Sequence, residues 1–390
     1  MDYTKAKFFF KLKKTVRYVR LFGFRRTFIK VLGQYHMKSK ETFDGDRWVN
    51  EACPSPDSEE RAIGIIGCGN FAFSNIAYYL FKIRRDFLRC AYDTVPSRSK
   101  SLCKRYRGAV ACSNWRDVVE DEGVKIVFIA SNHASHAEYA VACMKAGKHV
   151  HIEKPHVVSE EQLTLLREAM VGYPESKVFL GFNRPRSRLF MALRKELSRQ
   201  DGPLMINWFI AGHAIAEGHW YFDEREGGRV LGNLCHWTDL TIHLVSLERA
   251  FPCRIVSATP KDAKSDFVVS ISFADRSCAV ISFSAKGHTF EGVRETLHVH
   301  RGDLLASLYD FQVLETEVVE KKRRHSLFHR EHGHEVNIRN SLDSALGSGV
   351  GETLAYVNAT AKFFLAIRRA IETGEEVVLS RNEAMGERVS

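Results

Sequence analysis

The 390-residue sequence lacks several features that would assign it to a class directly. None of its nine cysteines forms a Cys-x-x-Cys pair, and their spacing suits no zinc site. An odd, scattered set in a chain of this size indicates reduced thiols, so we expect a cytoplasmic protein with no metal site. No stretch of 18 uninterrupted apolar residues is present, so no membrane-spanning helix is expected, and the N-terminus does not resemble a secretory signal.

Beyond its first 40 residues the sequence also lacks net charge. The total is +10, but residues 1–40 contain twelve Lys and Arg and one acid, Asp2, whereas the other 350 residues contain 45 basic and 46 acidic residues. A neutral body argues against nucleic acid as a partner. No internal repeat or low-complexity tract is present, and the length suits two domains.

The basic N-terminal arm, residues 1–37, is expected to be helical. Two helices are predicted, at about residues 5–22 and 24–32, ended by Gly23 and Gly33. One face of the first helix is mostly aromatic and aliphatic and the opposite face carries Lys and Arg, although the separation is imperfect. Such an arm is typical of peripheral contact with the inner surface of a membrane, and equally of packing on the protein's own body or on a partner subunit.

Residues 38–60 are polar and contain Pro54 and Pro56, which indicates a linker. Residues 61–182 then alternate apolar strands with helical stretches, which predicts a doubly wound parallel sheet with right-handed crossovers, a Rossmann-type dinucleotide-binding domain. The expected strands are 62–66, 88–91, 125–130, 149–152 and 178–181. The expected helices are 73–83, 97–106, 115–119, 135–146 and 159–171.

Residues 183–390 change to a period-two pattern, which predicts an α+β domain with an open, mainly antiparallel sheet. Its strands are expected at 204–210, 254–259, 266–274, 278–285, 296–300 and 304–308, and its helices at 187–200, 234–247 and 353–373. The charged stretch 320–334 is expected to be a solvent loop. Its histidines, His325, His329, His332 and His334, suit a solvated tract better than a metal site, because no acid or Cys pattern frames them.

The strongest chemical signal is the turn Gly67-x-Gly69-x-x-Ala72, which follows an apolar strand and opens a helix. Gly67 permits the tight turn, Gly69 lets the backbone approach a pyrophosphate, and the helix N-terminus faces the phosphate charge. Asp93 ends the next strand and is placed to accept hydrogen bonds from ribose hydroxyls, unless it is only a surface turn residue. It favours NAD over NADP, although Arg98, five residues on, leaves NADP as the alternative.

A second signal is Glu153-Lys154-Pro155 at the end of a later strand. The carboxyl ends of parallel strands face the ligand crevice, so the Lys154 amine is expected beside the nicotinamide ring. There it could hydrogen-bond a substrate oxygen or act as a base if its pKa is lowered. The alternative is a structural Glu–Lys pair that ends the strand.

With these motifs and three more, the sequence resembles the Gfo/Idh/MocA family, which includes glucose–fructose oxidoreductase and inositol dehydrogenase. The additional motifs are Ala130-Ser-Asn-His-Ala-Ser-His136, Gly181-Phe-Asn183-Arg184, and Gly227-Gly228-Arg-Val-Leu-Gly-Asn233-Leu-Cys-His236-x-x-Asp239. The resemblance covers about residues 61–375. The sequences of these motifs are most similar to those of members from bacterial polysaccharide gene clusters and of two-module oxidoreductases.

The resemblance implies an NAD(P)-dependent oxidoreductase that transfers hydride between nicotinamide and a sugar hydroxyl carbon. The sugar is expected to be nucleotide-linked or lipid-linked, and the protein a homo-oligomer, either a dimer or a tetramer. The resemblance also points to a cis Lys154–Pro155 bond. It implies that Lys154 positions the substrate and that His236 takes the hydroxyl proton, so these two are the catalytic residues.

The resemblance also implies two binding sets. The cofactor-binding residues are Gly67, Gly69, Asn70, Phe71, Asp93, Ser131, Asn132, His133, His136, Glu153, Lys154 and Arg184. The substrate-binding residues are Lys154, Asn183, His219, Trp220, Asn233 and His236. Trp220 suits a wall for a sugar face and equally a core aromatic.

One position departs from the family pattern. Many members carry Asp four residues before the histidine as a proton partner, and here that position is Gly232, followed by Asn233. Asn can orient a hydroxyl but cannot exchange a proton near neutral pH. Two alternatives therefore stay open: an NAD-dependent enzyme that uses transient oxidation to cleave or eliminate a glycosidic group, and a non-catalytic NAD- or sugar-binding protein.

Overall fold

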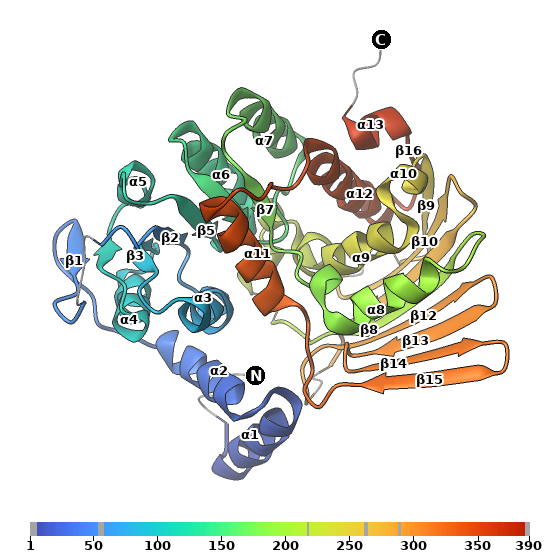
Figure 1. The fold of residues 1–390 in the computed structure, drawn as a ribbon, viewed down its shortest axis with the longest axis horizontal. Coiled ribbons are helices and arrows are strands. Elements are labelled where there is room, and N and C mark those ends of the chain that lie inside the picture. Colours follow the sequence, from blue (N-terminus) through green and yellow to red (C-terminus); the bar gives the residue numbers. More distant parts are fainter. Residues whose placement is uncertain (1–5, 54–57, 217, 261–263, 288–289, 387–390) are drawn as a thin grey trace.

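Two sheets, each packed against helices, organise the chain (Figure 1). The computed structural model describes residues 6–53, 58–216, 218–260, 264–287 and 290–386. The predicted two-domain α/β class, with a parallel Rossmann sheet followed by a mainly antiparallel sheet, is confirmed. None of the helices in the described ranges is long and apolar enough to cross a bilayer.

The first sheet has seven strands in the order β1-β4-β3-β2-β5-β6-β7. All pair in parallel except β1, which is antiparallel to β4. The strands are β1 Arg47–Val49, β2 Ile63–Ile66, β3 Leu88–Tyr92, β4 Val110–Cys112, β5 Ile126–Ile129, β6 His149–Ile152 and β7 Val178–Leu180. The sequence order reverses on either side of β2, which creates the crevice where such sheets bind ligands. The linker expected at 38–60 is corrected in part, because β1 lies within it; Pro54 and Pro56 lie outside the described residues.

The helices of this lobe follow the expected segments. They are η2 Ala72–Ile76, a π-turn, then α3 Ala77–Ile83, α4 Pro96–Tyr106, α5 Trp115–Glu120, η3 His133–Ser135, α6 His136–Lys145 and α7 Glu160–Gly172. Two begin with side-chain caps: Asn114 accepts from the Arg116 N–H, and Ser159 from the Gln162 N–H. These caps satisfy N–H groups that the first turn of a helix leaves without a partner.

The second sheet has nine strands in the order β15-β14-β13-β12-β8-β11-β10-β9-β16. They are β8 Met205–Ala211, β9 Cys253–Ser257, β10 Asp266–Phe273, β11 Cys278–Ser284, β12 Arg294–Arg301, β13 Leu304–Tyr309, β14 Val313–Val318, β15 Lys321–Ser326 and β16 Val377–Leu379. Within this second sheet, only β8 and β11 pair in parallel among the described strands. The solvent loop expected at 320–334 is wrong in part, because β15 lies there. Its six side chains are all exposed, so the segment lacks the alternation of apolar and polar residues that predicts a strand.

The helices that follow β7 belong mostly to the second lobe, and several of them also contact the first lobe (Figure 1). They are η4 Arg184–Arg186, α8 Arg188–Leu197, η5 Trp220–Phe222, η6 Glu224–Glu226, η7 Val230–Leu234, α9 Cys235–Val245, α10 Leu247–Ala250, α11 His334–Leu346, α12 Leu354–Thr373 and α13 Arg381–Met385. Helix α11 packs on α3, and its Ile338 and Leu342 join the apolar core around β2 and β3. Helix α12 contacts α7 of the first lobe and β9 of the second sheet.

The N-terminal arm forms α1 Phe8–Phe22 and α2 Phe24–His36, and both helices pack on the body. Arg17 of α1 pairs with Glu291 of the second lobe, and the Arg330 N–H donates to the Leu21 carbonyl over 2.8 Å. Gly23 ends α1 as expected. Gly33 does not end the second helix, which is a correction. It lies inside α2, at a position where a Cβ would lie only 2.3 Å from Asn70 Oδ1.

Candidate active site

A cleft of about 460 Å³ opens at the carboxyl ends of the parallel strands. It brings together twelve residues that the sequence assigned to cofactor or substrate: Gly67, Gly69, Asn70, Phe71, Asp93, Ser131, Asn132, His133, His136, Glu153, Lys154 and Trp220. They come from five separate stretches of sequence. Parallel strands that end at one edge of a sheet explain why these stretches meet.

The glycine turn has the geometry that a dinucleotide requires. Gly67 has φ of +89°, and a Cβ there would lie 2.5 Å from the Ala130 carbonyl carbon, so the turn passes against the backbone that follows β5. A Cβ at Gly69 would meet nothing within 4 Å, because this residue faces the open cleft. The buried Asn70 Oδ1 has no hydrogen-bond partner. A pyrophosphate fits in front of this turn, next to the helical segment that begins at Ala72.

Asp93 closes the turn from the adjacent strand. Its Oδ2 accepts from the Cys68 N–H over 2.7 Å and its Oδ1 from the Val95 N–H over 2.8 Å. Each carboxylate oxygen can accept a further bond, so ribose hydroxyls can still be held. Arg98 lies 3.6 Å from Asp93 and lines the same cleft, which leaves NADP as the alternative cofactor.

The arm contributes to this turn, which the sequence did not reveal. His36, at the end of α2, places Nε2 2.7 Å from the Cys68 carbonyl and Nδ1 2.9 Å from the Ser101 hydroxyl. The ring stacks on Phe73 at 4.2 Å between centroids. Met37, the next residue, lines the cleft. The arm therefore supports the cofactor-binding turn as well as covering the body.

The turn that contains Ser131, Asn132 and His133 is held by Glu226 of the second lobe. Glu226 Oε1 accepts from the Asn132 side chain over 2.6 Å, and the Glu226 carbonyl lies 2.9 Å from His133 Nδ1. His136 lies behind this turn, 2.8 Å from the Pro155 carbonyl, and burial lowers its pKa. Glu226 stands in no motif, so only the fold could identify it.

Lys154 reaches from the first lobe to the second. Its Nζ donates to the Gly232 carbonyl over 2.6 Å, and the Lys154–Pro155 bond is cis as expected. Gly232 is the position where the family pattern places Asp. A Cβ there would lie 2.7 Å from His133 Cε1 and 2.9 Å from Tyr221 Cε2. The two rings fill the space that an Asp side chain would need, and the ammonium group bonds the backbone carbonyl.

His236 lies on α9, one turn beyond the carbonyl that Lys154 contacts. Its side chain is buried, and Nδ1 has no hydrogen-bond partner. Burial lowers the pKa of His236 well below its usual range, and the charges of Arg184 and Lys154 lower it further. The imidazole is therefore neutral near pH 7 and able to accept a proton. His236 and Asn233 do not line the cleft that holds the glycine turn.

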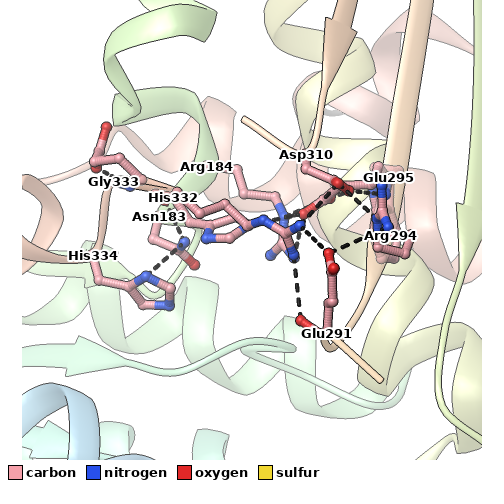
Figure 2. Close-up of polar contacts among 12 residues, drawn as sticks. Asn183, Arg184, Glu291, Arg294, Glu295, Asp310, His332, Gly333 and His334 are labelled. Carbon is pink, nitrogen blue, oxygen red and sulfur yellow. Dashed lines mark hydrogen bonds and ion pairs between the residues drawn. The ribbon is translucent and has the colours of Figure 1, made fainter. Parts of the chain in front are cut away.

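Arg184 and Asn183 also lie outside that cleft, in a polar network within the second lobe (Figure 2). Arg184 Nε is 2.9 Å from Glu295 Oε2, and His332 Nε2 is 3.2 Å from Glu295 Oε1. Burial alone would raise the pKa of Glu295, but Arg184 and His332 bring it to about 2. Arg184, which was expected to contact the cofactor, pairs with the buried carboxylate of Glu295. His332, which was expected to be solvated, is the other partner of this carboxylate.

The remaining assigned residues lie at the rim. Trp220 is 44% exposed, and its ring meets His133 edge-on at 4.8 Å between centroids, so it forms a cleft wall and not a core aromatic. His219 does not line the cleft, and its Nδ1 accepts from the Tyr221 N–H over 3.2 Å.

This fold and cleft define a two-domain protein with a Rossmann-type dinucleotide-binding lobe, and comparison with known proteins agrees. Residues 61–173 match the model of the Gfo/Idh/MocA family, described as an oxidoreductase family with an NAD-binding Rossmann fold. Inositol 2-dehydrogenase 2 of Saccharopolyspora erythraea is 27% identical over 135 residues, 35% of this chain and 40% of that protein. The chain thus aligns with less than half the length of such curated relatives.

Solved structures extend the likeness to both lobes. Levoglucosan dehydrogenase in complex with NADH and levoglucosan has a TM-score of 0.70 at 17% identity, covering 81% of this chain and 98% of that one. GenD2 from gentamicin A biosynthesis, in complex with NAD, has a TM-score of 0.70 at 20% identity, covering 82% and 96%. Residues 61–173 match the NAD-binding Rossmann domain of this family, as the motifs predicted.

Proposed function

We propose that the protein is a NAD(P)-dependent dehydrogenase that transfers hydride between nicotinamide and a hydroxyl-bearing carbon of a sugar. The observation that carries the proposal is the bond from Lys154 Nζ to the Gly232 carbonyl. It joins the cofactor cleft to the helical segment that carries His236. The family match and the likeness to dehydrogenases of inositol and levoglucosan support the same activity.

Bound NAD would supply the hydride acceptor, and the chain's own residues would handle the proton. His236 is the proposed proton acceptor, because burial keeps its ring neutral near pH 7. Lys154 is the proposed positioning group for the hydroxyl oxygen. Asn233, next to Gly232, is proposed to orient the substrate, since the space for a carboxylate at position 232 is filled by His133 and Tyr221.

The test is reduced-nicotinamide absorbance with NAD or NADP and a panel of free sugars, inositols and nucleotide-linked sugars. Net production of NADH or NADPH is expected. Turnover of a glycoside without net reduced cofactor would favour the cleaving or eliminating alternative. Tight cofactor binding without turnover of any substrate would favour the non-catalytic alternative and contradict the proposal.

We further propose that the substrate is a sugar linked to a nucleotide or a lipid, as in polysaccharide assembly. The surroundings of His236 support an anionic substrate, because the cations Arg184 and Lys154 both lower the pKa of its ring. An imidazolium formed there would have cationic neighbours, and a substrate phosphate would offset them. Free sugars turned over as efficiently as their nucleotide-linked forms would contradict this step.

The arm is proposed to touch the cytoplasmic surface of a membrane as well as the body. On α1, Phe8, Phe9 and Leu12 are 71%, 80% and 49% exposed, and on α2, Phe24 and Phe28 are 72% and 51% exposed. These apolar side chains stand among Lys and Arg, which suits an anionic bilayer surface. The double variant Phe8→Ser/Phe9→Ser should no longer pellet with anionic vesicles. A wild-type protein that never pellets with them would overturn the membrane contact.

The open face of the second sheet is proposed to bind a second copy of the chain. Phe209 of β8 and Tyr309 of β13 both pair with Thr296 of β12, so they lie in one row across the sheet, 56% and 36% exposed. Met205, on the same face of β8, is 54% exposed. Sedimentation should show a dimer or tetramer that Phe209→Asp dissociates, whereas Leu165→Asp on α7 should not. A monomeric wild type would contradict the interface.

A further inference from the structure

A second cavity, of about 380 Å³, lies between the arm and the first lobe. Lys14 and Tyr18 of α1, Thr27 and Lys30 of α2, and Asn70 and Phe71 of the first lobe line it. No Asp or Glu is among the described residues that line it. Asn70 and Phe71 also line the cofactor cleft, so the two cavities share a wall.

Lys30 is the central residue of this cavity. Its ammonium group lies 4.9 Å from the centroid of the Phe22 ring, and within the described chain no carboxylate pairs with it. Burial and the nearby Arg26 lower its pKa to about 7. Some of its surface stays accessible because the side chain faces the cavity. An amine held among cationic groups without an acid gains stability from a bound anion.

Polar groups that could complete an anion site are also present. Thr27 is 2% exposed, and its hydroxyl has no hydrogen-bond partner. Asn70 lines the same cavity, and its carboxamide can supply N–H donors. Lys14 contributes a second ammonium group, whose pKa burial also lowers. Two amines and a hydroxyl donor match the acceptor oxygens of a phosphate.

The cavity lies on the side of the cleft that faces the second lobe. Phe71 contacts the ring of His334, with centroids 5.9 Å apart. Lys30 also borders a further cavity of about 380 Å³ that His332 and His334 line. His334 stands beside Asn183 in the network of Figure 2. A chain of neighbours thus leads from Asn183, one of the expected substrate-binding residues, through His334 to Lys30.

We propose that Lys14 and Lys30 bind a phosphate or diphosphate group carried by the sugar substrate. The inference rests on the proposed function, and it assigns the arm a role in substrate recognition. The arm is fixed for this role from both sides. Arg26 donates to the Ser74 carbonyl and to the Asn75 side chain, and Arg17 pairs with Glu291.

The test uses the full-length protein saturated with NAD, so that the glycine turn is occupied. Inorganic pyrophosphate and UDP are titrated by calorimetry into the wild type, Lys30→Gln and Lys14→Gln. Lys13→Gln is the matched control, because it removes the same charge from an exposed position of α1 that does not line the cavity. We expect both cavity variants to weaken binding at least tenfold and the control to change it less than twofold.

Two results would overturn the inference: no binding of either probe by the wild type, or equal binding by the wild type and Lys30→Gln. If Lys30→Gln and Lys14→Gln lost binding only to vesicles of anionic phospholipid, the inference would also be overturned, because the ligand would then be a lipid headgroup. If the protein turns over free sugars with NAD but binds no phosphate, the inference would be wrong and the proposed function would stand. If phosphate binding depends on Lys30 but no sugar yields reduced cofactor, the inferred site would stand and the proposed activity would fail.

Discussion

His156 gives the most quantitative prediction, because it ties the Lys154 segment to the second half of the chain. It follows Pro155, is fully buried, and its Nε2 lies 3.0 Å from the Val357 carbonyl on α12. Burial lowers its pKa to about 4, the Val357 hydrogen bond opposes that shift, and the charge of His136 adds to it. The folded protein therefore holds this imidazole neutral where the unfolded chain would bind a proton.

The sign follows from the two pKa values. Above the unfolded pKa of about 6.5 both states are neutral and His156 contributes no pH dependence. As the pH falls below 6.5 the unfolded chain binds the proton first, so stability is lost down to the folded pKa of about 4. For these values the free energy of unfolding falls by about 2 kcal/mol between pH 7.5 and pH 5.

The assay is urea unfolding of the wild type and His156→Gln at pH 7.5 and pH 5. Gln can still donate to the Val357 carbonyl but does not titrate, so the variant should lose about 2 kcal/mol less than the wild type over this range. His298→Gln, at an exposed strand position, is the control and should leave the wild-type slope unchanged. Equal pH dependence in the wild type and His156→Gln would refute the reasoning.

Three further predictions concern the cofactor turn and the polar network around Glu295. Gly67→Ala should destabilise the fold by about 2 kcal/mol or more and abolish NAD binding, measured by thermal shift and calorimetry, because its Cβ would lie 2.4 Å from a backbone nitrogen at positive φ. Glu295→Gln should lower the free energy of unfolding in urea by about 3–5 kcal/mol, because it leaves the buried Arg184 without a counter-charge. His36→Ala should weaken NAD binding about tenfold by calorimetry, since a buried carbonyl of the glycine turn loses its donor; unchanged affinity would show that the arm does not support the turn.

Patterns within single elements allowed most of the first lobe to be predicted. The run that ends at Gly67 and the stretch before Lys154 are apolar and bounded by turns, so their strands and their shared edge follow from sequence. Strand β15 could not be found this way, because its fully exposed Lys and Arg side chains carry no period-two signal. Gly33 misled the helix boundary because a glycine required by a close tertiary contact looks the same as one that ends a helix.

The candidate site was predictable where one motif supplies each residue, as for Asp93 and Lys154. It was not predictable where partners meet only through tertiary packing. His36 and Glu226 reach the site from the arm and from the second lobe, in stretches without a motif. Arg184 matched a motif, yet its environment is set by Glu295, which lies 111 residues away in sequence.

The most direct test of the central claim compares the wild type with Lys154→Ala and His236→Ala on a sugar that the panel shows to be turned over. Each variant should lose about 10²-fold or more in kcat while its affinity for NAD, measured by calorimetry, stays close to that of the wild type. Near-wild-type kcat in both variants would contradict the assignment of an ammonium group and an imidazole, from separate lobes, to one reaction centre.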